Sequence, residues 1–288
     1  MHSASTVMID GRIVPSGQAV VSIFDRGFLY GDSVFETLRS YQGRLFALDA
    51  HLERLQRSAE RVFIPLPVSL AELRAELLEA TRIQGSPESY VRLTLTRGIG
   101  RTLGLDPELA EKPLRVVLVT DLALPPAELY ERGIAAITFR AERPSDAAGV
   151  ADAKIGNYLL AVLAMRAARA QGAAEALLED AHGFILEGST ANVFAVFRGT
   201  LVTPPQGAAI LPGITRARVL DIARGTLPAV ERPLHKAELV QADEVFITSS
   251  IRELMPVVRI DGHAVGPGTP GPITLELLSR FRAAALRG

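Results

Sequence analysis

The sequence predicts an α+β fold in two domains, and three observations support this. Strand-like and helix-like segments are mixed along the chain, without the regular strand–helix alternation of a parallel α/β sheet. A proline-containing break, "DLALPPAE", interrupts them at residues 121–128. The 288 residues, 48% of them hydrophobic, are enough for one large domain or two modest ones. We therefore predict a small N-terminal α/β domain (residues 1–120), an interdomain linker (121–128) and a larger C-terminal domain (129–288).

The N-terminal domain is predicted to open with a short strand pair, because "VMIDGRIVP" turns at an Asp-Gly dipeptide. A hairpin with a Gln-Gly turn follows over residues 33–48. A helix is predicted over residues 49–63, because apolar side chains recur on one helical face: Leu52, Leu55, Ala59, Val62 and Phe63. A second helix opens at a capping box that begins with Ser69. Strands are expected over residues 89–98 and 114–121.

The C-terminal domain is predicted to begin with a strand over residues 133–140, followed by a helix after Asn157. Three further strands are read from "EALLED", "NVFAVF" and "EVFITSS". A helix is expected after "LPGIT", and a last helix at "PITLELLSRF".

Composition excludes several classes of function. The net charge is −1 with both signs interspersed, so no basic surface for nucleic acid is predicted. There is no cysteine, and the five histidines lack ligand spacing, so we expect no disulfide and no metal site. No signal peptide and no apolar run of about 20 residues is present, so we expect a cytoplasmic protein without membrane contact.

Lys154 is the first candidate for chemistry. The chain has 31 lysines and arginines, but lysine occurs only at positions 112, 154 and 236. A lysine amine can lose its proton, attack a carbonyl and form a Schiff base, whereas arginine stays protonated. Lys154 directly precedes a short "IGNY" segment and an apolar helix. Taken alone, it is better explained as one exposed charge among many.

Three later segments add groups that suit the same site. Glu187 ends a strand-like run and is followed by small residues. "LPGIT" starts a helix, whose N-terminal N–H groups and dipole favour an anion. Thr248, Ser249 and Ser250 end a strand with three hydroxyls that can donate to phosphate oxygens. Each segment alone has an ordinary structural explanation, but together they supply an imine-forming lysine, a carboxylate and two phosphate cradles.

Six segments, in this order, resemble one family over nearly the whole chain: "FDRGFLYGDSVFETLR", "HLERL", "KIGNYL", "EGSTANVF", "LPGITR" and "TSSIRELMPV". The chain is thereby similar to the fold-type IV (class IV) aminotransferases, which depend on pyridoxal 5'-phosphate (PLP). This family includes branched-chain aminotransferases, D-amino acid aminotransferases and aminodeoxychorismate lyases. The resemblance implies the two-domain D-amino acid aminotransferase-like fold, PLP as cofactor, amino acid and 2-oxo acid substrates, and a homodimer.

The resemblance also implies roles for individual residues. Lys154 matches the catalytic Schiff-base lysine, Glu187 the carboxylate facing the pyridine nitrogen, and Arg54 the arginine on the cofactor phosphate. Ile214 and Thr215 match the residues whose backbone N–H groups hold that phosphate. The other expected cofactor contacts are Tyr158 at the O3′ atom, Leu211 on the ring, and Ser249 and Ser250 as hydroxyl ligands. Branched-chain enzymes carry one more residue between lysine and tyrosine than "KIGNY" does.

The substrate remains open among three branches of the family. Candidate substrate-binding residues are Tyr30, Phe35, Arg39, Tyr90, Arg92 and Arg101, with Thr37 as a further wall. "YGDSVFE" resembles branched-chain enzymes, whereas the lysine–asparagine spacing and "TSS" resemble the D-amino acid and lyase branches. The leading expectation is ping-pong transamination between a branched-chain or aliphatic L-amino acid and 2-oxoglutarate. The alternatives are a D-amino acid transaminase, an aminodeoxychorismate lyase giving 4-aminobenzoate and pyruvate, and a catalytically silent binding protein.

Overall fold

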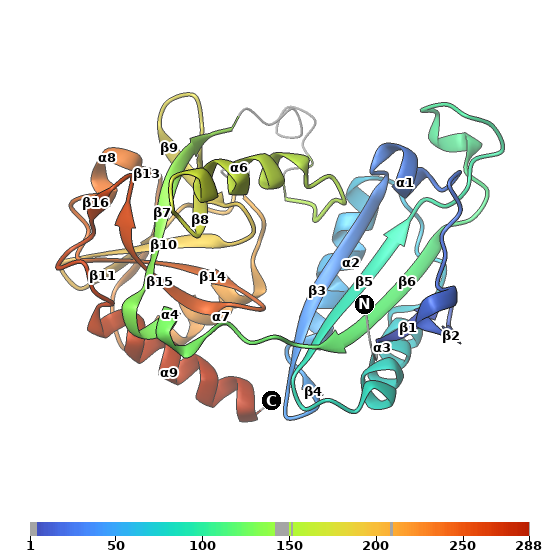
Figure 1. Cartoon of the computed structure of the whole chain (residues 1–288), viewed down its shortest axis with the longest axis horizontal. Helices are drawn as coiled ribbons and strands as arrows, with labels where there is room; N and C mark the ends of the chain where they lie inside the picture. Colours follow the sequence, from blue (N-terminus) through green and yellow to red (C-terminus); the bar gives the residue numbers. More distant parts are fainter. Residues whose placement is uncertain (1–4, 142–149, 151, 208–209, 288) are drawn as a thin grey trace. The chain divides into compact units, whose positions relative to one another are not determined.

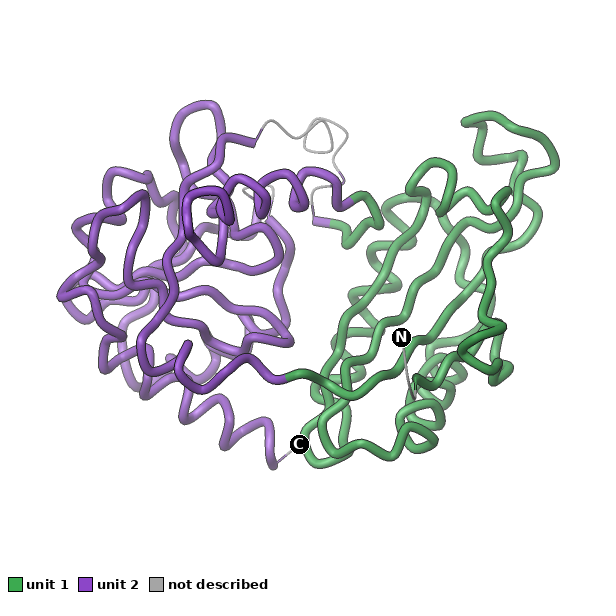
Figure 2. The backbone as a smooth tube through the Cα atoms, in the orientation of Figure 1, with its two compact units in different colours: residues 1–123, 153–157, 288 green, residues 124–152, 158–287 purple. Residues whose placement is uncertain are grey.

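The computed structural model of the chain (Figure 1) describes residues 5–141, 150, 152–207 and 210–287. The described residues form two compact units (Figure 2). Unit 1 consists of the chain up to Ala123 together with Ala153–Asn157, and unit 2 of Leu124–Asp152 and Tyr158–Arg287. The change of unit after Ala123 lies inside the segment predicted as a linker. The return of the Lys154 segment to unit 1 differs from the sequence expectation, which assigned this lysine to the C-terminal domain.

Unit 1 contains, within the described residues, a six-stranded sheet of order β2-β1-β6-β5-β3-β4, in which every neighbouring pair is antiparallel. The bounds of its strands are β1 (Thr6–Ile9), β2 (Arg12–Val14), β3 (Ser33–Tyr41), β4 (Arg44–Leu45), β5 (Ser89–Thr96) and β6 (Leu114–Asp121). The predicted hairpin is present as β3 and β4, with Ser40 paired to Leu45. Long-range pairing of β5 with β3 and β6 then places the predicted strands in the middle of the sheet.

Helices α2 (Leu48–Arg61) and α3 (Leu70–Gln84) of unit 1 pack against the sheet, and the hydrophobic core lies between them and the strands. Unit 1 also contains helix α1 (Arg26–Tyr30) and the short turns η1 (Ser16–Gln18) and η2 (Pro107–Leu109). The buried cluster combines side chains of α2 and α3 with those of β3, β5 and β6: Leu52, Leu55, Leu73, Leu77, Val34, Leu38, Val91, Leu93 and Val117. The predicted capping box is confirmed, because Ser69 Oγ accepts from the Glu72 N–H and the Glu72 carboxylate accepts from the Ser69 N–H.

The prediction that Phe63 lies on the apolar face of the first helix is wrong. The helix ends at Arg61, and Phe63 has φ of +55° and is 83% exposed. The Arg97 guanidinium donates to the carbonyl oxygens of Val62 and Phe63 at 2.7 and 2.6 Å. It thereby supplies hydrogen-bond donors to the two carbonyl groups that directly follow the helix. Ile64, only 2% exposed, takes the buried position instead.

Unit 2 is built on a second sheet, whose order in the described part of the chain is β12-β11-β10-β14-β15-β7-β8-β9-β13, with β16 beside β15. The pairs β11/β12, β15/β7 and β7/β8 are parallel, and the other pairs are antiparallel. One antiparallel sheet and one mixed sheet, each with its own helices, confirm the predicted α+β class.

The strands of unit 2 are β7 (Ile134–Arg140), β8 (Glu175–Glu179), β9 (Phe184–Gly188), β10 (Asn192–Phe197), β11 (Thr200–Thr203), β12 (Ala229–Glu231), β13 (Leu234–His235), β14 (Glu244–Ser249), β15 (Glu253–Ile260) and β16 (His263–Ala264). Its helices are α4 (Ala127–Arg132), α6 (Leu159–Ala170), α7 (Ile214–Ala223), α8 (Lys236–Leu239) and α9 (Pro272–Arg287). The predicted helices after Asn157 and after "LPGIT" are α6 and α7. Among the described helices, none has the length and apolar character needed to cross a membrane.

Candidate active site

Lys154 is anchored to unit 1 through its own backbone. Its N–H donates to Ser58 Oγ at 3.0 Å, and its carbonyl oxygen accepts from the Phe35 N–H at 3.0 Å. Gly156 N donates to Ser33 O at 2.7 Å. A Cβ at position 156 would lie 2.1 Å from Ser33 Oγ, so only glycine permits this approach. These contacts explain why the lysine segment belongs to unit 1.

The Lys154 side chain lies beside an aromatic ring. Its Nζ is 4.6 Å from the centroid of the Phe35 ring, and Arg92 Cζ is 3.7 Å from the same centroid. Phe35 is buried in the middle of β3. The Phe35 ring thus joins the predicted catalytic amine to one predicted substrate-binding arginine.

Four of the six predicted substrate-binding residues share one face of the unit 1 sheet. In the pairing of β3 with β5, Thr37 is opposite Arg92 and Arg39 is opposite Tyr90. Side chains alternate along a strand, so Phe35, Thr37 and Arg39 project from the face that also carries Tyr90 and Arg92. Arg39 already has a charge partner, because its Nε donates to Glu88 Oε2 at 3.0 Å.

Tyr30 and Arg101 lie elsewhere in unit 1, on α1 and on the loop between β5 and β6. Tyr30 Oη accepts from the Gly104 N–H at 3.2 Å. Arg101 donates through Nη2 to the Glu108 carbonyl oxygen at 3.0 Å. The Arg26 guanidinium also donates to the carbonyl oxygens of Gly104 and Leu105. The structure therefore links Tyr30 with the Arg101 loop, separately from the sheet face that carries Phe35.

Arg54 is part of a buried cluster that the sequence analysis did not identify. Its Nε and Nη2 donate to the two carboxylate oxygens of Glu36, both at 2.7 Å. His51 Nδ1 lies 2.7 Å from Glu36 Oε2. All three side chains are buried. The spacing of His51 and Arg54, three residues apart on α2, placed both on one helical face, but only the fold brings Glu36 of β3 to them.

Burial and charge act in opposite directions on this cluster. Burial raises the pKa of Glu36, but the charge and hydrogen bonds of Arg54, with those of His51, outweigh it and lower the pKa to about 2. Burial lowers the pKa of His51, and Glu36 opposes this only in part, while the charges of Arg54 and Lys154 lower it further. Glu36 is therefore a fixed anion between two basic side chains at neutral pH.

In unit 2, Glu187 lies near the end of β9 and is hydrogen-bonded to the loop between β11 and α7. Its Oε2 accepts from the Leu211 N–H at 3.2 Å. Asn192, at the start of β10, lies 3.5 Å from the same oxygen through Nδ2 and donates to the Leu211 carbonyl oxygen at 2.9 Å. Glu187 and Leu211, both predicted site residues, are thus brought together. The structure adds Asn192, which sequence reasoning passed over within "EGSTAN".

Ile214 and Thr215 form the first turn of α7, and Gly213 is the residue before it. The first N–H groups of an α-helix have no partner within the helix, and no side chain of Gly213 can cap them. A Cβ at Gly213 would lie 1.9 Å from Asn192 Oδ1, so the chain passes here only as glycine. The asparagine that contacts Glu187 therefore also fixes the start of α7.

The hydroxyl segment lies at the end of β14. Asn192 is paired with Thr248 across β10 and β14, which brings this strand end beside the Glu187 segment. Ser249 Oγ accepts from the Arg252 N–H at 3.2 Å. Thr248 Oγ1 is buried and, within the described residues, has no hydrogen-bond partner. Ser250 follows the strand, and Tyr158 directly precedes α6.

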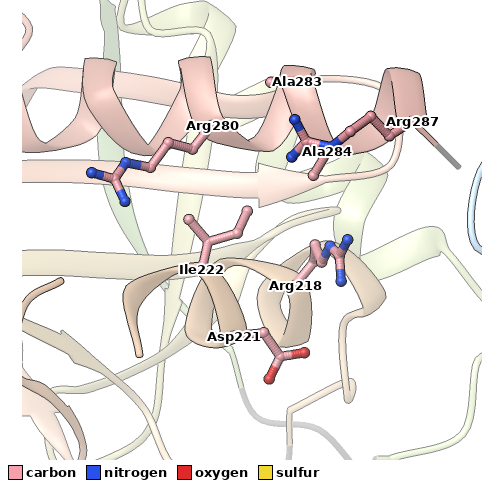
Figure 3. Close-up of a pocket in the computed structure, with 7 residues that line it drawn as sticks. All are labelled: Arg218, Asp221, Ile222, Arg280, Ala283, Ala284 and Arg287. Carbon is pink, nitrogen blue, oxygen red and sulfur yellow. The ribbon is translucent and has the colours of Figure 1, made fainter. Parts of the chain in front are cut away.

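A separate hollow of about 440 Å³ lies between α7 and α9 of unit 2. Figure 3 shows the side chains around it: Arg218, Asp221, Ile222, Arg280, Ala283, Ala284 and Arg287. None of the predicted site residues is among them. The residues of α7 that line the hollow begin at Arg218, whereas the predicted phosphate contacts, Ile214 and Thr215, are at the start of that helix.

Comparisons with known proteins identify relatives over nearly the full length. A sequence model of the family described as amino-transferase class IV matches residues 33–260. The chain is 41% identical over 278 residues (96% of this chain, 95% of the relative) to a Methanocaldococcus jannaschii protein provisionally named a branched-chain-amino-acid aminotransferase. It is 36% identical over 286 residues (97% of each chain) to the D-alanine aminotransferase of Bacillus licheniformis.

Solved structures agree with the sequence relatives. The T.th. branched-chain amino acid aminotransferase, complexed with N-(5'-phosphopyridoxyl)-L-glutamate, superposes with a TM-score of 0.92. The sequences are 31% identical, and the match covers 99% of this chain and 95% of the other. The expected fold-type IV architecture is confirmed.

Proposed function

The chain belongs to the class IV aminotransferases, and from this premise we propose that it binds PLP through Lys154. The observation that carries the proposal is the anchoring of Lys154. Its backbone is fixed on both sides by Ser58 and Phe35, while its amine lies beside the Phe35 ring. A lysine whose main chain is held in this way presents its amine from a constrained position, as a covalent attachment site requires.

The residues present fit the chemical groups of PLP. Donors that suit a phosphate are present in each unit: the first N–H groups of α7 and the Ser250 hydroxyl in unit 2, and the Arg54 guanidinium in unit 1. Thr248 Oγ1 is a buried hydroxyl still lacking a partner in the described part of the chain. A protonated pyridine nitrogen needs a carboxylate, which Glu187 supplies from a position fixed by the Leu211 N–H. Leu211 and Tyr158 are proposed as further contacts, to the ring and to O3′.

In the proposed chemistry, one side chain stabilises a proton on the cofactor and another moves a proton of the substrate. Bound PLP supplies an electron-withdrawing ring that weakens the Cα–H bond of an amino acid. Glu187 favours the protonated ring nitrogen, because a nearby anion stabilises a cation. Once the substrate amine has replaced it on PLP, the released and neutral Lys154 Nζ would be able to take up the proton of the substrate Cα. The fixed backbone of Lys154 keeps this amine within reach of one face of the substrate.

For the substrates we propose a branched-chain or aliphatic L-amino acid and 2-oxoglutarate. The 41% identical archaeal relative and the superposed structure carry branched-chain names. On the sheet face that also carries the buried Phe35, the half-buried Tyr90 ring offers apolar area, and Arg92 can pair with the distal carboxylate of 2-oxoglutarate. Arg39 contributes less to such pairing, because Glu88 already neutralises it.

A D-amino acid transaminase is the second candidate. It is favoured by the 36% identity to a D-alanine aminotransferase and by Arg101, whose loop is held by Tyr30 and Arg26. A guanidinium on a fixed loop can clamp an α-carboxylate and so select the orientation of the substrate.

One set of assays tests the cofactor and the substrate together. Borohydride treatment of the yellow protein should fix PLP onto Lys154, whereas labelling at Lys112 or Lys236 would refute the assignment. A panel of L- and D-amino acids with 2-oxoglutarate and pyruvate then identifies donor and acceptor. Release of pyruvate and 4-aminobenzoate from aminodeoxychorismate, without any transamination, would instead identify a lyase.

We also propose that the protein is a homodimer. In unit 1, the segment before and within α1 and the β5–β6 loop are joined by Arg26. They expose apolar side chains that a second copy would cover: Val20, Val21, Ile23, Phe24, Phe28, Leu103 and Leu105. A closed two-fold assembly is the commonest oligomer. Light scattering that finds a fully active monomer at assay concentration would overturn this proposal.

A further inference from the structure

Glu175 is a buried carboxylate of unit 2 to which the proposed chemistry gives no role. It is the first residue of β8 and is 0% exposed. Its Oε1 accepts from the N–H of Ser189 at 3.0 Å and from the Ser189 hydroxyl. Its Oε2 lies 2.6 Å from Arg252 Nη2, in an ion pair that lacks the alignment of a hydrogen bond. Burial of a carboxylate without partners costs several kcal/mol. The contacts with Ser189 and Arg252 are therefore needed to keep the Glu175 carboxylate in its buried position.

The two partners of Glu175 belong to the two turns that follow predicted site residues. Ser189 lies two residues after Glu187, in the turn between β9 and β10. Arg252 lies in the turn between β14 and β15, shortly after Ser249 and Ser250. Arg252 Nη2 also donates to Thr190 Oγ1 at 3.1 Å, so the guanidinium reaches into the first turn. The Arg252 N–H donates to Ser249 Oγ, which ties the backbone of the second turn to its own hydroxyl.

We propose that Glu175 and Arg252 are positioning residues that set the spacing between the two ends of the cofactor site. This inference rests on the proposed function, in which Glu187 contacts the ring nitrogen and Ser250 the phosphate. Those two groups belong to one rigid molecule, so the protein groups that meet them must keep a fixed separation. The Glu175–Arg252 pair joins the turn that follows Glu187 to the turn that contains Ser250, and neither residue of the pair needs to touch the cofactor.

The chain offers a matched control on the same strand. Glu179 is the last residue of β8, is 7% exposed, and has its Oε1 2.9 Å from Lys236 Nζ. This pair joins β8 to the start of α8, and neither element carries a predicted site residue. Glu175→Gln and Glu179→Gln therefore each remove one negative charge from the same strand. Only Glu175→Gln weakens the contact between the β9–β10 turn and the β14–β15 turn.

The test measures PLP affinity and thermal stability separately, by equilibrium titration of PLP into the stripped full-length protein and by the melting temperature without PLP. We expect Glu175→Gln and Arg252→Ala each to raise the Kd for PLP about tenfold or more, equivalent to ~1.4 kcal/mol. The double variant should lose less affinity than the sum of the two single losses, because both changes break the Glu175–Arg252 ion pair. Glu179→Gln should keep the Kd within about twofold of the wild type, even where its melting temperature falls equally.

A positioning role also predicts a change in the bound cofactor itself. A shift of Glu187 relative to the ring nitrogen alters the visible absorption of the bound PLP and its dependence on pH, which loss of stability alone does not. Arg252→Lys, which retains the charge, should restore part of the affinity lost in Arg252→Ala. Arg252 is partly exposed, so its variants test the inference even where Glu175→Gln fails to fold.

Unchanged Kd and spectrum in Arg252→Ala, or equal losses of affinity in Glu175→Gln and Glu179→Gln, would overturn the inference. A wild-type protein that binds no PLP would instead overturn the proposed function on which it rests. The two failures are distinguishable, because the affinities of the variants can be compared only when the wild-type protein binds PLP.

Discussion

Glu36 and Arg54 form a buried, bidentate ion pair, with both N–O distances at 2.7 Å. The pair joins β3, the strand that also carries Phe35, to α2, the helix that also carries Ser58. Phe35 and Ser58 are the two residues that bind the backbone of Lys154. The orientation of Arg54 and the position of the lysine segment therefore depend on the same strand–helix contact.

Glu36→Gln should destabilise the protein strongly, because it removes the carboxylate that forms a bidentate ion pair with the buried Arg54 guanidinium. Removal of one partner of a buried pair typically costs about 3–5 kcal/mol. Urea unfolding at pH 7 measures this loss as a lower midpoint. Glu79→Gln, which removes an exposed partner of Arg82, is the control and should leave the midpoint nearly unchanged. Equal midpoints for the two variants would contradict the assignment.

Acidification should lower the stability in two stages. The pKa of His51 is lowered in the folded protein, so the unfolded chain takes up a proton first and stability falls as the pH drops below about 6.5. The pKa of Glu36 is lowered to about 2, so its contribution is complete above about pH 4.5 and is lost as the pH falls toward 2. The second stage amounts to about 3 kcal/mol. Unfolding free energies between pH 8 and pH 2 measure both stages, and a flat profile would refute them.

Glu187→Gln should keep the fold, because a glutamine oxygen still accepts from the Leu211 N–H. Transamination at saturating PLP should fall at least about 100-fold, since each ~1.4 kcal/mol of lost transition-state stabilisation is tenfold in rate. Single-turnover absorbance changes measure the step directly. A variant with a rate near that of the wild type would show that the carboxylate has another role.

Arg101→Ala distinguishes the two substrate candidates. With an L-amino acid donor, the change should leave kcat nearly intact and at most raise the KM for 2-oxoglutarate. With a D-amino acid donor, loss of the clamp on the α-carboxylate should abolish turnover. Steady-state rates with L-leucine and D-alanine measure this. Arg12→Ala, a change at another exposed arginine of unit 1, should alter neither rate.

Local patterns explain why much of the fold was predictable. The capping box at Ser69 and the Gln-Gly turn act within a few residues, so the sequence around them is sufficient. Phe63 was misplaced because Arg97, 34 residues away, binds the carbonyl end of the helix. Helical periodicity carries no information about such a partner.

The sequence predicts the candidate site as a set of residue types, but it does not predict the contacts that hold those residues in the structure. Lys154, Glu187 and Arg54 stand in motifs that can be read in order. Glu36, Asn192 and Glu175 hold their partners through contacts between segments that only the tertiary fold brings together. A buried glutamate in a strand looks the same in sequence whether it binds an arginine of a helix or the turn of another strand.

The assignment of Ala153–Asn157 to unit 1 limits how this polypeptide can be divided. A fragment that ends at residue 123 would lack Lys154, and one that starts at residue 124 would carry it without Ser58 or Phe35. Neither piece alone would contain the Lys154 amine together with the two residues that bind its backbone. If Lys154 carries PLP as proposed, PLP colour and turnover should be absent from each piece and should return only when the two are mixed. The polypeptide would then be a template for a split reporter.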